Sequence, residues 1–191
     1  LMINMTSVMS PDLFNELSHF MGTNPLVQFM MQPILLFAVL FHFIQGFRLE
    51  LKNKAARNQK YAMYKGASNA TWVSRNMVYS GLTILAFFAL HFIDFWIPEI
   101  MHKYVHFEPE NATRYFPEMV AKFENPVRVG FYAIAFVFLG LHLMHGFQSA
   151  FQSVGMRHPK YLPMIQMLGK LYSIAIPAGF IFIAIFHFIK S

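Results

Sequence analysis

The stretch FVFLGLHLMHGFQ, residues 136–148, decides the fold class, because two histidines interrupt an apolar run that is typical of a membrane span. Two other runs have the same character. LLFAVLFHFIQGF at 35–47 contains His42, and TILAFFALHFIDFW at 83–96 contains His91. A histidine in hydrocarbon is costly unless it has a partner. We therefore take these histidines as candidate functional residues of a membrane protein.

The composition supports this class. Of the 191 residues, 56% are hydrophobic, 13% are charged and 23 are Phe, whereas a soluble domain is about half apolar and about a quarter charged. The absence of cysteine excludes disulfides, thiolate zinc sites and cysteine-ligated iron–sulfur clusters held by this chain. The formal net charge of +6 comes from basic connections between apolar spans rather than from a long nucleic-acid-binding arm.

Four segments are long and apolar enough to cross a membrane as helices, which takes about 20 residues. They are residues 28–50, 76–97, 127–151 and 171–190. The apolar start LMINMTSV (1–8) is too short to span, and we expect it to be the end of a helix that begins upstream. The sequence predicts an all-α, polytopic transmembrane bundle in which residues 1–191 form one domain, with four full spans visible and five in the natural chain.

The charge of the connections predicts the orientation of the bundle. Residues 52–75 and 153–170 contain several Lys and Arg residues but no acid. Residues 9–27 and 98–126 contain more acids than bases. By the positive-inside rule, the first pair of connections faces the cytoplasm and the second pair faces outward.

Position along a span gives depth, since a helix rises about 1.5 Å per residue. His42 and His145 lie at the same level, nearer the cytoplasmic ends of their helices, whereas His91 lies near an outer end. Two imidazoles at one level on facing helices meet the requirement for the axial ligands of a haem b in a helical bundle. We predict an inner haem held by His42 and His145 and an outer haem held by His91.

Two of these assignments have alternatives. His142 lies three residues before His145, on nearly the same helix face. It is either the inner ligand itself or a contact of a haem propionate, a backbone carbonyl or a neighbouring helix. The partner of His91 is either His187, near the outer end of the last span, or a residue upstream of Leu1.

Small and basic residues near these histidines suit the same prediction. Four glycines in the histidine-bearing helices leave room for a flat porphyrin or for a neighbouring backbone; they are Gly46, Gly81, Gly140 and Gly146. Arg48, Arg75 and Lys170 lie at the predicted inner boundary. We take them as candidate counter-charges for haem propionates.

Motifs along essentially the whole chain carry a family resemblance. They are HFIQGFRLELK at 42–52, SRNMVYSG at 74–81, LHFIDFW at 90–96, NPVRVG at 125–130 and, most specifically, LHLMHGFQSAFQSVG at 141–155. With these motifs the chain resembles the succinate dehydrogenase cytochrome b subunit. More narrowly, it is similar to the single-polypeptide, five-helix, dihaem membrane anchor of succinate:quinone and quinol:fumarate oxidoreductases.

The resemblance implies a subunit of an enzyme whose succinate site lies on another subunit. A flavoprotein with FAD and an iron–sulfur protein would bind at the cytoplasmic face of a bacterial inner membrane. Electrons would pass through two haem b groups to menaquinone or another quinone of the respiratory chain. In that family the second and fourth spans hold the inner haem and the first and third hold the outer one. This implies His42 with His145, and His91 with a residue upstream of Leu1.

The quinone pocket is predicted near the outer segment FNELSHFMGTNP (14–25), where Glu16 and His19 are candidate proton donors. Some quinol-oxidising relatives carry a glutamate two residues before the fourth-span ligand. Leu143 stands there in this chain, which favours succinate oxidation as the physiological direction.

Two other functions suit buried histidines. One is a cytochrome b anchor of a different respiratory dehydrogenase. The other is a haem-free, proton-coupled transporter with a histidine relay. Against the transporter, the spans contain no carboxylate at membrane depth apart from Asp94 near an outer boundary, and no inverted repeat is evident.

Overall fold

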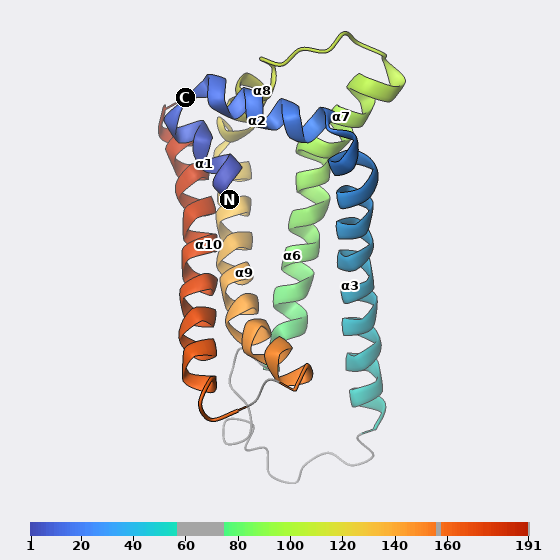
Figure 1. Ribbon diagram of the computed structural model, residues 1–191, viewed down its shortest axis with the longest axis vertical. Helices are drawn as coiled ribbons and strands as arrows, with labels where there is room; N and C mark the ends of the chain where they lie inside the picture. The colour runs from blue at the N-terminus through green and yellow to red at the C-terminus, as the bar shows by residue number, and fades with distance from the viewer. Residues whose placement is uncertain (57–74, 156–157, 191) are drawn as a thin grey trace.

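The computed structural model describes residues 1–56, 75–155 and 158–190, which form a bundle of helices (Figure 1). Four helical spans are long and apolar enough to cross a membrane: Val27–Ala55, Met77–Val105, Pro126–Ser153 and Leu162–Lys190. The predicted all-α class is confirmed for the described residues, and their four long apolar helices are consistent with the predicted multi-pass membrane protein. A fifth span and the bound haems stay predictions.

Part of the predicted topology lies outside the described residues. The basic connection at 52–75 is described only at its two ends, and Arg157 of the second basic connection is not described. The cytoplasmic placement of these connections stays a prediction.

One end of the bundle is covered by short helices, and we call it the capped end. They are α1 (Met2–Met9), α2 (Pro11–Thr23) and α8 (Tyr115–Phe123). In Figure 1, α2 lies across this end of the long helices. The side-chain oxygen of Asn15 accepts a hydrogen bond of 2.7 Å from the amide of Phe116, which ties α2 to α8. We call the opposite end, where α3 stops, the far end.

The first two spans each contain a π-helical turn just before a proline. The first consists of η1 (Val27–Met31) and α3 (Gln32–Ala55), and the second of α6 (Met77–His91), η2 (Phe92–Trp96), α7 (Ile97–Ile100) and η3 (Met101–Val105). The amide of Gln32 bonds to the carbonyl of Val27, and that of Ile97 to the carbonyl of Phe92. Pro33 and Pro98 follow directly. Proline has no amide proton to donate within a helix. In the π turn before each proline, an amide bonds to the carbonyl five residues earlier instead of four.

The last two spans are single helices, α9 (Pro126–Ser153) and α10 (Leu162–Lys190). The side chain of Asn125 accepts hydrogen bonds from the amides of Val127 and Arg128, which caps the start of α9. The α10 helix starts at Leu162 rather than at the predicted residue 171. Hydropathy located the apolar centre of the span, but the helix continues beyond it.

The α9 and α10 helices pack closely through glycine. A Cβ atom added at Gly140 of α9 would lie 3.0 Å from the backbone oxygen of Ser173 and 3.5 Å from the ring of Pro177 in α10. In a regular helix the Ser173 carbonyl would accept a hydrogen bond from the amide four residues later, but Pro177 has no amide proton. Likewise, a Cβ atom added at Gly169 of α10 would lie 2.8 Å from the ring of Phe147 in α9. We call this contact the closed interface.

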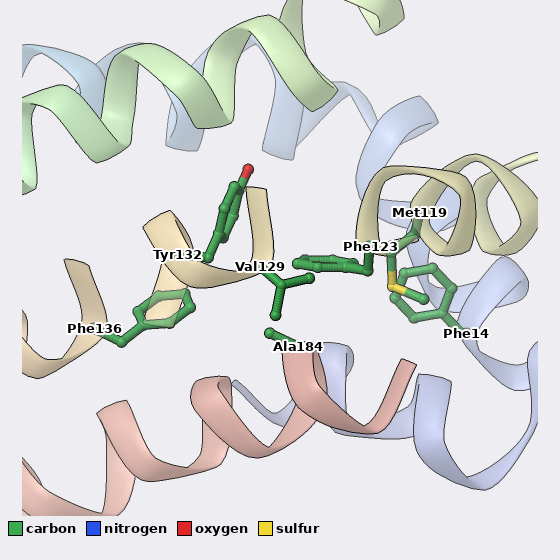
Figure 2. Close-up of a cluster of buried hydrophobic side chains, with 7 residues drawn as sticks. All are labelled: Phe14, Met119, Phe123, Val129, Tyr132, Phe136 and Ala184. Carbon is green, nitrogen blue, oxygen red and sulfur yellow. The ribbon is translucent and has the colours of Figure 1, made fainter. Parts of the chain in front are cut away.

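The core lies between the capped end and the closed interface. Figure 2 shows its buried side chains, which come from α2, α8, α9 and α10; they are Phe14, Met119, Phe123, Val129, Tyr132, Phe136 and Ala184. In contrast, every residue of α3, all within the described range, is half-buried or exposed. We call the side of α9 and α6 that faces α3 the open side.

Candidate functional site

His42 of α3 and His142 of α9 meet on the open side. Their ring centroids lie 6.0 Å apart, and the ring planes are 80° from parallel. A bond from a metal to an imidazole nitrogen is about 2 Å long, so two imidazoles on opposite sides of one metal have centroids roughly 6 Å apart. The observed separation matches that value, and it is also the separation of an edge-to-face ring contact.

The histidine that meets His42 is not the one that depth alone favoured. His145 is half-buried one turn further along α9, and its ring does not contact that of His42. Three residues turn a helix by about 300°, so the two side chains differ by about 60° around the axis. Depth favoured His145, but the facing direction of the two side chains favours His142. The preference for His145 thus gains no support from this geometry, and its ligand role stays a prediction.

Glycines leave open space on the same side. Gly46 and Gly146 each lie four residues after a histidine of this pair, so they share its helix face. A Cβ atom added at either glycine would meet no described atom within 4 Å. Gly81 of α6 borders His142, because a Cβ atom there would lie 3.9 Å from the ring carbon Cε1. The fourth predicted glycine, Gly140, serves the closed interface instead.

Ser80 contacts His142, although its position in the sequence did not mark it as a candidate. The hydroxyl oxygen of Ser80 lies 3.1 Å from Nδ1 of His142. Ser80 is buried on α6. The signal that could have found it is the motif SRNMVYSG, whose last two residues, Ser80 and Gly81, both border this ring.

His91 lies on the wall of a cavity of about 570 Å³ toward the capped end. Binding sites for cofactors and ligands have volumes of about 300–1,000 Å³. The ring centroid of His91 is 5.6 Å from that of Phe87 and 5.2 Å from that of Phe95, both on the same wall. Its Nδ1 atom is buried and has no hydrogen-bond partner among the described residues.

His187 does not lie at this cavity. Its Nε2 atom is 2.9 Å from the hydroxyl oxygen of Ser7, and both side chains are buried. Its ring packs against Phe116, with centroids 5.8 Å apart. The described cavity wall includes Ile183 and Ala184 of α10 but not His187. The structure thus gives no support to His187 as the partner of His91.

A buried carboxylate joins the second span to α9 beside the cavity. The Asp94 side chain is 1% exposed; its Oδ2 atom accepts a hydrogen bond of 3.0 Å from the Tyr132 hydroxyl and lies 3.1 Å from Nε of Arg128. Figure 2 shows the Tyr132 hydroxyl pointing out of the hydrophobic cluster, toward α6. The one intramembrane acid that the sequence singled out is therefore paired with a base, which supports a structural role.

The two candidate quinone residues differ in position. His19 lines a second, more polar cavity of about 370 Å³ at the capped end, and its Nε2 atom is 3.9 Å from a carboxylate oxygen of Glu110. Glu16 is exposed and is on the described wall of neither cavity.

Tyr115 lies on both cavity walls. Burial raises the pKa of its phenol, with the charges of Glu118 and Glu110 acting in the same direction and the guanidinium of Arg114 opposing them. The phenol therefore stays protonated at neutral pH and donates to a carboxylate oxygen of Glu99, 3.3 Å away.

The candidate propionate partners lie at the far end. Arg48 is exposed on α3, Arg75 is exposed just before α6, and Lys170 is exposed on α10. Their role toward propionates stays a prediction.

Within the described ranges, no group of three or more His, Cys, Asp or Glu side chains could enclose a free metal ion. Comparisons of the chain with models of known protein families, with curated proteins and with solved structures find no match.

Proposed function

We propose that this chain is the dihaem cytochrome b membrane anchor of a succinate:quinone oxidoreductase. The observation that carries the proposal is the meeting of His42 and His142, with ring centroids 6.0 Å apart, on a side of the bundle where glycines leave open space. The motif resemblance and the four possible membrane spans support the same function.

His42 and His142 would hold the inner haem, with His145 as the alternative to His142. Haem b, when bound, supplies one-electron redox chemistry. Gly46 and Gly146 leave room beside the ligating rings, and the ring of His42 is otherwise exposed on α3. Arg48 and Arg75 would supply positive charge to propionates at the far end. These side chains bind and orient the haem.

His91 would hold the outer haem. The cavity that it lines has the volume of a cofactor site, its wall near His91 is aromatic, with Phe87 and Phe95, and the buried Nδ1 atom lacks a protein partner among the described residues. Phe87 and Phe95 would exclude water from this ligand. The second ligand would come from a residue upstream of Leu1, as the resemblance implies.

A flavoprotein subunit and an iron–sulfur subunit would bind at the cytoplasmic face of a bacterial inner membrane. This chain would contribute anchoring, haem ligation and part of a quinone pocket, with menaquinone or another quinone as the electron acceptor. His19, on the wall of the polar cavity, is better placed than Glu16 to give a proton to a bound quinone.

The test is a pyridine haemochrome assay on the purified complex, which gives haem b per copy of this chain. We expect two haems, and copurification of a flavoprotein and an iron–sulfur protein with succinate:quinone activity. Two haems with different partner subunits would favour the anchor of another respiratory dehydrogenase. Absence of haem would overturn the proposal and favour the proton-coupled transporter.

A further inference from the structure

The hydroxyl of Ser80 makes two contacts that together determine where its proton lies. Its oxygen is 2.9 Å from the backbone oxygen of Met77 and 3.1 Å from Nδ1 of His142. A carbonyl oxygen cannot donate, so the hydroxyl donates its one proton to Met77. The contact with His142 is then made by an N–H group at Nδ1, which donates to a lone pair of the Ser80 oxygen.

This arrangement determines the tautomer of His142. A neutral imidazole with its proton on Nδ1 carries a lone pair on Nε2, and that lone pair is what binds a metal. The two nitrogens lie on different sides of the ring, so Nε2 points away from Ser80. Even a Cβ atom added at Gly81 would lie 3.9 Å from Cε1, an ordinary van der Waals distance, so the α6 backbone leaves the ring in this orientation without steric pressure.

The Ser7 and His187 pair uses the other ring nitrogen. The Ser7 hydroxyl donates to the backbone oxygen of Asn4 at 2.7 Å, so it too accepts from its histidine, but through Nε2 at 2.9 Å. There the serine occupies Nε2. At His142, Nδ1 is occupied and Nε2 is left available.

We infer that Ser80 is a positioning residue: it fixes the Nδ1–H tautomer of His142 and thereby presents Nε2 as the ligating atom of the inner haem site. The ligation half of this inference rests on the proposed function. A metal-binding histidine usually donates its other N–H group to an acceptor, which orients the ring and makes it a stronger ligand.

The test compares three variants of the full chain in its purified complex. Ser80→Ala removes the acceptor, and Ser80→Thr keeps a hydroxyl. Ser173→Ala is the matched control, because Ser173 is equally buried and its hydroxyl also bonds to the carbonyl three residues back, at 3.0 Å, but it has no histidine contact among the described residues.

In Ser80→Ala we expect haem transfer to a soluble haem scavenger to become about 10- to 100-fold easier at one of the two sites. The midpoint potential of that site should rise, since a weaker ligand stabilises the ferric state less. Ser80→Thr should restore both properties, and Ser173→Ala should change neither.

The tautomer is measured separately by nitrogen NMR of the histidine-labelled complex after its haem has been extracted, because iron bound at Nε2 would by itself keep the proton of a neutral imidazole on Nδ1. The His142 signal is assigned by its absence in His142→Ala. We expect the proton on Nδ1 in the wild type and on Nε2 in Ser80→Ala. Unchanged His142 protonation in Ser80→Ala would overturn the inference. If the wild-type complex carries no haem, the proposed function fails, while the NMR result still decides whether Ser80 fixes the tautomer.

Discussion

The two faces of α9 use glycine for opposite purposes. On the closed interface, Gly140 brings the backbone of α9 against the Ser173 carbonyl of α10, so that even one added carbon would be crowded. On the open side, Gly146 of the same helix and Gly46 of α3 border space that no described atom fills. The histidine pair lies on the open side.

The difference follows from how helices associate in lipid. Lipid tails are as apolar as leucine, so helices gain little from hydrophobic burial and associate through close packing of small residues and through polar contacts. The α9 and α10 helices have such a contact. The α3 helix contacts α6 and, through His42, α9, but it has no buried residue in its described range. A cofactor ligated from both sides would add to these contacts.

The largest expected effect is on haem content of the open side. His142→Ala should remove the inner haem, so that the haemochrome assay falls from two haems per chain to about one. His145→Ala is the control and should keep two, because the ring contact with His42 belongs to His142. Loss of haem in His145→Ala but not in His142→Ala would return the ligand role to His145.

The next largest effect is a loss of stability in variants of Asp94, whose side chain links the second span to α9. Asp94→Asn removes the charge that pairs with Arg128. Breaking a buried ion pair costs about 3–5 kcal/mol, and we expect about 3 kcal/mol, since the Arg128 side chain is 29% exposed and keeps part of its hydration. Thermal unfolding in detergent measures this loss.

A double variant checks the cause of that loss. Adding Arg128→Gln to Asp94→Asn removes the unpaired charge and should recover part of the stability. If the two changes simply add, the ion pair is not what Asp94 contributes.

The four spans were predictable because a long apolar helix is visible in the local hydropathy of the sequence. The ends of the spans were less predictable than their centres. The second span runs to Val105 rather than to residue 97, through π turns that bring the chain past Pro98. The sequence also indicated His42 and His91 as functional candidates, because histidine is costly in hydrocarbon.

The partners of those histidines depend on packing, which one sequence does not show. His142 and His145 differ by about one turn in depth and by rotation around the helix axis, and the sequence does not show which of the two faces α3. Ser80 was hidden among ordinary helix residues, since its role depends on a contact across 62 positions of the chain. His187 was near the expected depth but is directed to Ser7.

The comparison of the two faces is tested directly by matched glycine variants. Gly140→Val should lower stability by about 1–3 kcal/mol whether or not haem is bound, as overpacking does. Gly146→Val should leave the haem-free chain unchanged and reduce haem occupancy instead. Thermal unfolding and haem content are both measured for each variant. Equal destabilisation of the haem-free chain by the two variants would contradict the distinction between the faces.

The smallest effect is expected at the contact between α1 and α10. Ser7→Ala leaves the Nε2–H group of His187 without an acceptor in a buried position. Polar contacts between helices in membranes contribute about 0.6 kcal/mol on average, and a buried unsatisfied donor costs about 1–3 kcal/mol, so we expect a loss of about 1 kcal/mol in thermal unfolding. Haem content should not change, because His187 is not on the described wall of the His91 cavity. Loss of one haem in Ser7→Ala, repeated in His187→Phe, would instead make His187 the second ligand of the outer site and remove the need for one upstream of Leu1.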